Sequence, residues 1–269
     1  MDSERIIRMI QLIASDLDGT LLLNGSQELE DGIFPVIQEL TKRNILFVAA
    51  SGRQYPNLRR LFAPVADQIA YIAENGSYVV YKGNVLFQSN IKKELCDQLI
   101  ETILSQDGCE VLISSPKTSY LIPKTVEFHT HVKDIVKNDV IVIKDASEIK
   151  EDIIKVAFYH KDGINDELIS SIADNYKGII QGVGSGNLWY DFMNPNVNKG
   201  NAIKILQKQL NINTEHTMAF GDSYNDVEML KEAKYSYAAA DAVDDVIEVC
   251  KHRFVKVEDV LTDLLKQSN

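Results

Sequence analysis

Residues 9–20 read MIQLIASDLDGT, an apolar run that ends in two aspartates, a glycine and a threonine. An apolar run of the length of residues 9–15 is typical of a β-strand that is buried on both faces in a parallel sheet. A turn at Asp18, which Gly19 permits, could aim the carboxylates of both Asp16 and Asp18 into one pocket. Asp and Gly are also common in turns without a chemical role, so the motif alone leaves both interpretations open.

The chain on both sides of this stretch alternates between apolar strands and amphipathic helices. This alternation predicts a doubly wound, Rossmann-like α/β core with a parallel sheet. The expected strands of the core cover residues 9–15, 45–50, 68–73, 217–220, 235–239 and 253–255. The expected helices cover residues 33–40, 58–62, 202–210, 227–233, 243–249 and 260–265.

The middle of the chain follows another pattern. Asn75-Gly76 lies between two apolar segments and predicts a hairpin. Hairpin strands and helices are mixed beyond it, which favours a separate α+β domain with an antiparallel sheet. The expected helices there are 92–104, 126–136 and 166–175, and the expected strands are 110–114, 119–122, 153–159, 179–183 and 187–191. We therefore predict a discontinuous core of residues 1–82 and 191–269, with an inserted domain of residues 83–190.

The composition narrows the class of partner. The chain has 269 residues with 28 Lys+Arg and 39 Asp+Glu, a formal net charge of −11. An acidic protein repels nucleic acid and anionic membranes, so neither is an expected partner, and an anionic ligand would need local positive charge. No stretch approaches the ~18 apolar residues of a membrane span, and Arg5 and Arg8 interrupt the N-terminal apolar residues, so no signal peptide is expected. Cys96, Cys109 and Cys250 are widely spaced, which indicates reduced thiols in a cytoplasmic protein.

Four polar segments follow expected strands or begin a helix. They are Asp16-Leu17-Asp18-Gly19-Thr20, Ser51-Gly52-Arg53, Asn198-Lys199-Gly200, and residues 221–226, which read GDSYND. In open α/β sheets the functional crevice lies beyond the carboxyl ends of the strands, so these segments are expected to meet. Converging carboxylates repel each other, and a divalent cation with oxygen ligands, such as Mg²⁺, removes that conflict. Ser51-Gly52 offers a hydroxyl and open backbone N–H groups to a phosphate, although Ser51 could equally cap a helix. Lys199 lies near a helix start, where the helix dipole disfavours a cation, although a solvated surface lysine is the default for any single Lys.

Taken in this order, the four segments resemble the motifs of the haloacid dehalogenase superfamily of phosphohydrolases. The insertion between the second and third motifs resembles a C2-type (C2B-like) cap, and Glu74-Asn75-Gly76 resembles the Cof subfamily. The resemblance implies that Asp16 is a nucleophile that forms an aspartyl-phosphate, and that Asp18 is a general acid and then a base with a raised pKa.

The resemblance also assigns the binding residues. Mg²⁺ would be held by Asp16, the backbone carbonyl of Asp18, Asp222 and, further out, Asp226. The phosphate would be bound by Ser51, Gly52, Lys199 and Asn225. Three positions depart from the family pattern: Ser223, Asn198 beside the lysine, and the segment Ala240-Asp241-Ala242, which replaces a more usual Gly-Asn-Ala.

Two further motifs lie in the inserted domain. His129 and His131 form an H-x-H pair, which lacks an obvious third metal ligand and fits two surface or helix-face histidines better. Trp189-Tyr190 could line the crevice between the domains, although packing is the more frequent role of such a pair.

These observations predict a cytoplasmic, Mg²⁺-dependent phosphatase of small phosphomonoesters, such as sugar phosphates or related metabolites. A phosphosugar mutase would share the aspartyl-phosphate but depend on a bisphosphate activator. A non-catalytic phosphometabolite sensor is the third alternative, and it would not need Asp18. No motif predicts an oligomeric state.

Overall fold

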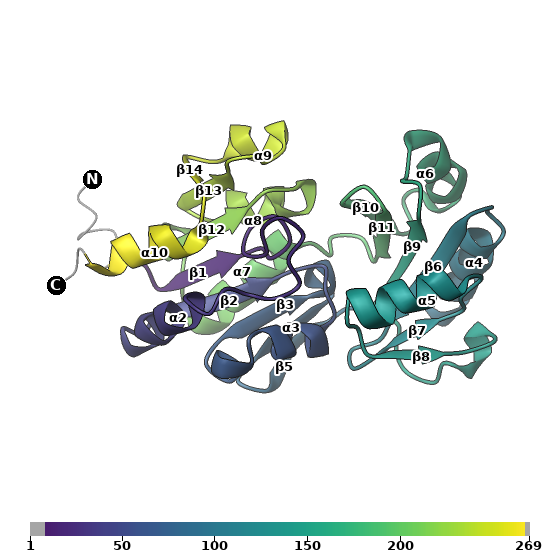
Figure 1. The fold of residues 1–269 in the computed structure, drawn as a ribbon, viewed down its shortest axis with the longest axis horizontal. Coiled ribbons are helices and arrows are strands. Elements are labelled where there is room, and N and C mark those ends of the chain that lie inside the picture. Colours follow the sequence, from purple (N-terminus) through teal and green to yellow (C-terminus); the bar gives the residue numbers. More distant parts are fainter. Residues whose placement is uncertain (1–8, 267–269) are drawn as a thin grey trace.

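The computed structural model describes residues 9–266 and contains two β-sheets, each covered by its own helices (Figure 1). The expectation about a signal peptide falls mainly on residues 1–8, outside the described range. The larger sheet has the order β14 (His252–Phe254), β13 (Tyr235–Ala239), β12 (Thr217–Gly221), β1 (Leu12–Ser15), β2 (Leu46–Ala50), β3 (Ala70–Ala73), β4 (Tyr78–Tyr81) and β5 (Asn84–Gln88). From β14 to β3 in this order, neighbouring strands are parallel. The β3–β4 and β4–β5 pairs are antiparallel.

Helices cover both faces of this sheet, which confirms the predicted doubly wound core. They are α2 (Ile33–Lys42), α3 (Tyr55–Leu61), α7 (Lys199–Leu210), α8 (Val227–Lys231), α9 (Asp244–Val249) and α10 (Val257–Lys266). Figure 1 shows α2 and α10 on one face, with α7 and α8 on the other. The sequence places the first strand too early, because β1 begins at Leu12 rather than at residue 9.

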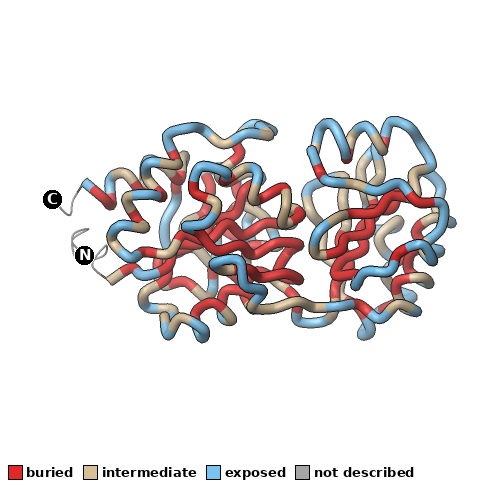
Figure 2. The backbone as a smooth tube through the Cα atoms, turned by 90° about the horizontal axis from the view of Figure 1, so that it is seen from below, coloured by how far each residue is buried: buried red, intermediate tan, exposed pale blue. Residues whose placement is uncertain are grey.

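Burial explains why β1 lies in the centre of the sheet. Leu12, Ile13 and Ala14 are fully buried, as the unbroken apolar run predicts for a strand with helices on both faces. Buried residues gather along the strands of both sheets in Figure 2. The carboxyl end of β1 therefore has a rigid position between β2 and β12.

The predicted Asn75-Gly76 hairpin joins β3 to β4 through the 3-10 turn η2 (Glu74–Gly76). Glu74, Asn75 and Gly76 all have positive φ, and that of Gly76 is 103°. A Cβ at Gly76 would lie 2.5 Å from the backbone carbonyl oxygen of Asn198, so only glycine fits there. The turn therefore packs directly against the start of α7.

The second sheet is built from the inserted segment. Its order is β10 (Gln181–Ser185), β11 (Trp189–Met193), β9 (Lys155–His160), β6 (Cys109–Ser114), β7 (Ser119–Leu121) and β8 (Val140–Val142). Its helices are α4 (Lys93–Leu104), α5 (Val126–Thr130), the π-helical η3 (His131–Ile135) and α6 (Asp166–Ala173). The sheet is antiparallel except for the β7–β8 pair, which is parallel. We call this unit the cap and the other unit the core.

Strand membership moves the two predicted domain boundaries. β5 extends the core sheet to Gln88, beyond the expected limit at residue 82, and β11 extends the cap sheet to Met193, beyond residue 190. The two connections between the units therefore cover residues 89–92 and 194–198. The expected helix 126–136 is also divided, since α-helical geometry changes to π-helical geometry at His131.

Short 3-10 turns complete the described chain. Besides η2, they are η1 (Ala63–Val65), η4 (Ala146–Glu148), η5 (Asp174–Tyr176), η6 (Thr214–His216) and η7 (Tyr224–Asp226). The three cysteines are free thiols, as expected, with Cys96 and Cys109 buried. Over residues 9–266, the helices are all too short or too polar to cross a membrane.

Candidate active site

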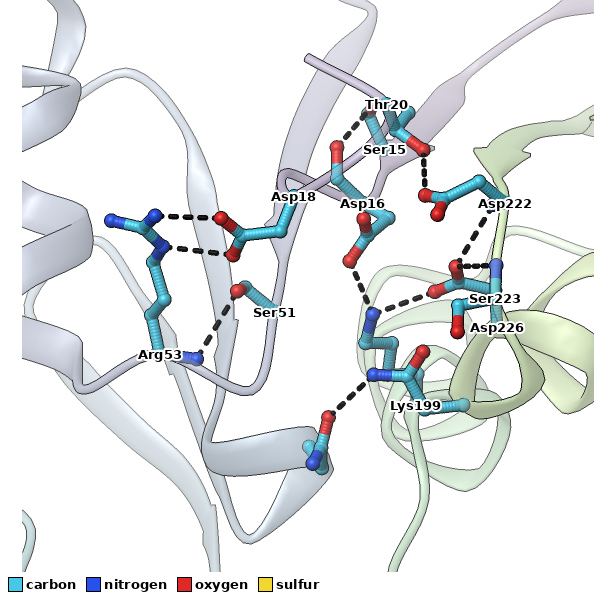
Figure 3. Close-up of polar contacts among 12 residues, drawn as sticks. Ser15, Asp16, Asp18, Thr20, Ser51, Arg53, Lys199, Asp222, Ser223 and Asp226 are labelled. Carbon is cyan, nitrogen blue, oxygen red and sulfur yellow. Dashed lines mark hydrogen bonds and ion pairs between the residues drawn. The ribbon is translucent and has the colours of Figure 1, made fainter. Parts of the chain in front are cut away.

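The predicted site residues meet at one edge of the core sheet. Asp16, Ser51 and Asp222 directly follow β1, β2 and β12, which are neighbouring parallel strands. Lys199 is the first residue of α7, and Figure 3 shows its side chain between Asp16 and Asp226. The four motifs are thus brought together by the topology, as the predicted sheet requires.

Lys199 is fully buried and joins two carboxylates. Its Nζ lies 2.5 Å from Asp16 Oδ1 and 2.6 Å from Asp226 Oδ1. Burial alone would lower the pKa of Lys199, but the two carboxylates outweigh burial and raise that pKa above its usual value. The ion pairs therefore offset the unfavourable position of this cation at a helix start, and the surface-lysine alternative is wrong.

Three carboxylates form a compact acidic cluster. One oxygen from each of Asp16, Asp222 and Asp226 lies within 4.8 Å of the others. Burial raises the pKa of Asp16 well above its ordinary value, with a further contribution from Asp226. Burial, again with Asp226, raises the pKa of Asp222 to about 6. An oxygen-only donor set with this mutual repulsion fits a hard divalent cation such as Mg²⁺.

The three members of the acidic cluster have different freedom to bind a metal. Asp226 uses Oδ1 for Lys199, and its Oδ2 accepts hydrogen bonds from the backbone N–H groups of Asp222 and Ser223 at 3.1 Å each. Asp222 Oδ1 accepts from the Thr20 hydroxyl at 2.6 Å. Both oxygens of Asp226 are therefore engaged within the protein, which makes Asp226 a support for the loop rather than a ready ligand.

Gly19 allows the turn that follows β1 to pass close to Asp222. Its φ is 90°, and a Cβ at this position would lie 2.3 Å from Asp222 Oδ2. Any side chain here would therefore push against the acidic cluster. This explains why glycine follows Asp18 in the motif.

Asp18 is held by a residue that the sequence analysis left without a role. Arg53 donates from Nε to Asp18 Oδ2 at 2.8 Å and from Nη2 to Asp18 Oδ1 at 2.6 Å, as Figure 3 shows. The Arg53 side chain is only 10% exposed, whereas that of Asp18 is 54% exposed. Arg53 is thus a largely buried, bidentate clamp on an exposed carboxylate, and its place directly after Ser51-Gly52 was the available signal.

Ser51 shapes the second loop. It is buried, and its hydroxyl accepts a hydrogen bond from the backbone N–H of Arg53 at 3.1 Å. The N-cap residue of α3 is Gln54, so the alternative role of Ser51 as a helix cap is wrong. The neighbouring Gly52 carbonyl accepts a hydrogen bond from Lys155 of the cap at 2.8 Å.

A second buried charge cluster, which no sequence motif indicated, joins the cap to the loop of Ser51 and Gly52. Lys155 Nζ lies 2.6 Å from Glu74 Oε2 and 3.4 Å from Asp191 Oδ2. Asn75 donates to the same Asp191 oxygen at 2.7 Å and accepts from Asn225 Nδ2 at 3.0 Å. Asn225 is therefore linked to the cap through Asn75. We call Glu74, Lys155 and Asp191 the bridging cluster.

The departures from the family pattern keep the site intact. Ser223 forms a reciprocal capping box with Asp226 around η7. The segment 240–242 leads to Val243, whose N–H donates to the Asp222 carbonyl at 3.0 Å. Asn198 caps α7 by accepting from the Asn201 N–H at 2.7 Å. These side chains and the adjoining backbone support the loops that carry Asp222 and Lys199.

A cavity of about 370 Å³ lies between the core and the cap. Its lining includes six of the predicted site residues: Asp16, Asp18, Ser51, Gly52, Asp222 and Asn225. Lys199 and Asp226 are fully buried behind them. From the two cap motifs, His131 and Trp189 line the cavity. His131 stacks on Trp189, whereas His129 is not among the residues that line the cavity.

Comparison with known proteins agrees with this fold and site. The model of the haloacid dehalogenase-like hydrolases matches residues 13–260. The chain therefore belongs to the haloacid dehalogenase-like hydrolases, as the motifs predict, and is a Cof-type phosphatase, an enzyme that hydrolyses phosphoric monoesters.

Individual relatives span nearly the whole chain. The 5-amino-6-(5-phospho-D-ribitylamino)uracil phosphatase YbjI of Escherichia coli is 28% identical over 244 residues, which are 91% of this chain and 90% of that protein. The crystal structure of SMU.1108c from Streptococcus mutans is 28% identical, with a TM-score of 0.86 over 96% of this chain and 99% of that one. A haloacid dehalogenase-like hydrolase from Bacillus subtilis shares the fold with a TM-score of 0.82 at 21% identity, over 96% of this chain and 99% of that one.

Proposed function

We propose that this phosphatase hydrolyses small phosphomonoesters, such as sugar phosphates or related metabolites, in a Mg²⁺-dependent reaction through an aspartyl-phosphate on Asp16. One observation carries the proposal. The Asp16 carboxylate is held at the end of β1 by Lys199, beside Asp222, and it lines a cavity large enough for a small metabolite.

The proposed reaction has two steps. In the first, a carboxylate oxygen of Asp16 attacks phosphorus, the bond from phosphorus to the leaving oxygen breaks, and Asp18 supplies a proton to that oxygen. In the second, water attacks the phosphorus of the aspartyl-phosphate, and Asp18 accepts a proton from the water. Inorganic phosphate leaves, and the Asp16 carboxylate is restored.

Asp18 must exchange partners during this cycle. In the structure both of its oxygens accept hydrogen bonds from Arg53. Both oxygens are therefore occupied by the guanidinium group, so Asp18 has to move away from Arg53 to reach the leaving oxygen. Its side chain is more than half exposed, which leaves room for that movement.

Asp16, Asp222 and the backbone carbonyl of Asp18 would hold Mg²⁺, with Asp226 as a support. The bound ion would supply positive charge to the phosphoryl oxygens. Ser51, the Gly52 N–H and Asn225 would donate to the same oxygens. Lys199 positions Asp16 and adds a buried positive charge next to it. Local positive charge thus accounts for an anionic substrate on a protein with a net charge of −11.

Hydrolysis is better supported than phosphosugar mutation. Among the described residues that line the cavity, Arg53 and Lys155 are the two with permanently cationic side chains, and both are ion-paired. A bisphosphate activator would need a free cation for its second phosphate. A sensor would not need Asp18 in the cavity, and the family model that matches the chain is that of haloacid dehalogenase-like hydrolases.

The same proposal includes a small phosphorylated metabolite as the partner, rather than nucleic acid or a membrane, and a cytoplasmic location. The net charge of −11 and the three free thiols support these two points.

Phosphate release tests the proposal. Purified protein with Mg²⁺ should release phosphate from members of a panel of sugar phosphates that also contains 5-amino-6-(5-phospho-D-ribitylamino)uracil, the substrate in the name of the E. coli relative. Chelation of Mg²⁺ should stop the release. Asp16→Asn should lose turnover with an unchanged circular dichroism spectrum, and retained hydrolysis in this variant would sink the assignment of the nucleophile.

A further inference from the structure

The cap end of the cavity is built from stacked aromatic rings. Trp189 of β11 and Tyr159 of β9 are direct cross-strand neighbours, with ring centroids 4.9 Å apart. His131 of η3 stacks on Tyr159 at 5.1 Å and on Trp189 at 6.2 Å, with interplanar angles of 28° and 27°. Phe128 is buried and stacks on Tyr159 at 5.3 Å. We call His131 and Trp189, the two members that line the cavity, the aromatic wall.

The sheet pairing places this wall in line with the charged end of the cavity. Trp189 and Asp191 are two residues apart on β11, so their side chains lie on one face of the cap sheet. On β9, Lys155 and Tyr159 lie on the same face. One face of the cap sheet therefore changes from charged, beside the loop of Ser51, to aromatic, further along the strands. A ligand with its phosphoryl group at Asp16 would extend its other end along this face.

The chemistry around the aromatic wall is uncharged. Burial lowers the pKa of His131, so its imidazole is neutral near pH 7. Leu112, Val132 and Leu188 add apolar surface to the lining. Of the nearby polar side chains, Gln54 bonds to the backbone of Asp139, and the Asn138 carbonyl oxygen accepts from Asn57.

We propose that the aromatic wall binds a flat, uncharged aromatic or heteroaromatic ring on the leaving group of the phosphomonoester. This proposal rests on the proposed phosphatase function and names its substrate class. Stacking on Trp189 and His131 uses the half-buried ring surfaces that the cavity exposes. A sugar in the same place would offer C–H groups instead of a π-face to these rings, and an anionic group would meet Arg53 and Lys155, the two cationic side chains of the described lining, in ion pairs.

A binding experiment tests the aromatic wall directly, because Trp189 is the single tryptophan of the chain. The Asp16→Asn variant in Mg²⁺ is titrated with 2-phenylethyl phosphate and with its saturated analogue 2-cyclohexylethyl phosphate, and tryptophan emission is recorded. The two ligands have similar size, so a difference between them reports on the aromatic ring. We expect the aromatic ligand to change the emission and to bind about 10-fold more tightly.

Kinetics with matched variants gives the second readout. For the wild-type protein, kcat/KM should favour 2-phenylethyl phosphate over both 2-cyclohexylethyl phosphate and glucose 6-phosphate. Trp189→Leu should bring the ratio of the two matched esters close to one, mainly through KM. Tyr190→Leu is the control, because Tyr190 stacks on Phe158 and meets Phe192 edge-to-face and is not among the residues that line the cavity, and this variant should keep the ratio.

The outcomes separate the two proposals. Unchanged tryptophan emission on saturation with the aromatic ligand, an unchanged ratio in Trp189→Leu, or a preference for glucose 6-phosphate would overturn the aromatic wall while leaving the phosphatase proposal intact. Binding with the expected emission change, but no phosphate release from any ester by the wild-type protein, would instead overturn the proposed reaction.

Discussion

The two ends of the cavity are built on opposite principles. At the core end, charges are neutralised by ion pairs between distant parts of the chain: Lys199 pairs with Asp16 and Asp226 in the interior, and Arg53 pairs with the exposed Asp18. At the cap end, the lining consists of stacked and apolar side chains around a neutral His131. This difference supports our proposal that the core carries out the reaction and that the cap selects the leaving group.

The bridging cluster lies where the two ends meet. Lys155 belongs to the cap sheet, yet its ammonium group contacts the Gly52 carbonyl and Glu74 of the core. The position of the cap is thus coupled to the loop that we expect to bind phosphate. Variants in the core, in the bridging cluster and in the cap can therefore test whether the two ends of the cavity have these different roles.

Replacing Lys199 should have the largest effect. Lys199→Met leaves Asp16 and Asp226 as close, buried carboxylates without their cation, so turnover should fall by about 10³-fold. Steady-state phosphate release measures the loss. Lys204→Met is the matched control, because Lys204 lies on the same helix and is half exposed, and it should behave like wild type. A Lys199→Met enzyme with near-normal turnover would show that the core end does not depend on its ion pairs.

Replacing Lys155 should affect stability next most strongly. Lys155→Met leaves Glu74 and Asp191 buried without their cation, so the free energy of unfolding should fall by about 3 kcal/mol. Urea denaturation followed by circular dichroism measures the change. Lys161→Met, at an exposed position just after β9, is the control. A loss confined to the cap, with an unaltered core transition, would contradict the coupling of the two units.

Removing the clamp on Asp18 should have an intermediate effect on catalysis. Arg53→Ala frees both oxygens of Asp18 and should lower kcat by about 10- to 100-fold, because the carboxylate loses its fixed orientation. Arg53→Lys should recover little, since a single ammonium cannot reproduce the two parallel hydrogen bonds. Arg59→Ala, on the partly exposed Arg59–Asp67 pair, serves as the control in the same kinetic assay. Full activity in Arg53→Ala would show that catalysis does not depend on the hydrogen bonds from Arg53 to Asp18.

The smallest predicted effect is a pH-dependent stability that Mg²⁺ abolishes. Folding raises the pKa of Asp222 to about 6, so the folded state holds this proton more tightly than the unfolded state does. The resulting stability is fully present below about pH 4 and is lost as the pH rises through 6. Bound Mg²⁺ favours the ionised carboxylates and should remove this loss.

Thermal unfolding between pH 4 and 7, with Mg²⁺ and with a chelator, measures this effect. Asp222→Asn isolates it, because the asparagine does not titrate and this component of the pH dependence should be absent. If Mg²⁺ shifts the melting temperature equally at every pH, the acidic cluster is not its binding site.

The same comparison shows what could be predicted from the sequence. Asp16, Ser51, Lys199 and Asp222 were identifiable because local signals place each one directly after an apolar strand or at a helix start. Arg53 and Lys155 were missed as site residues, because their roles come from partners 35 and 36 or more positions away, which residue type alone does not indicate.

Parts of the fold escaped prediction for related reasons. β8 is apolar but has only three residues, and β5 follows a tight turn at the edge of the core sheet and begins and ends with polar residues, so neither gives a strong strand signal. The aromatic wall combines His131 of a π-helical turn with Trp189 of a strand, and only tertiary packing brings the two rings together.

Chemical trapping of the covalent intermediate tests directly whether Asp16 is the nucleophile. The wild-type protein is mixed with Mg²⁺ and a hydrolysed phosphomonoester, quenched in acid during turnover, and treated with borohydride, which reduces an aspartyl-phosphate to homoserine. Peptide mass spectrometry should find homoserine at position 16, only when substrate and Mg²⁺ were both present. Covalent phosphate on another residue, or steady turnover without any modified position 16, would contradict the account.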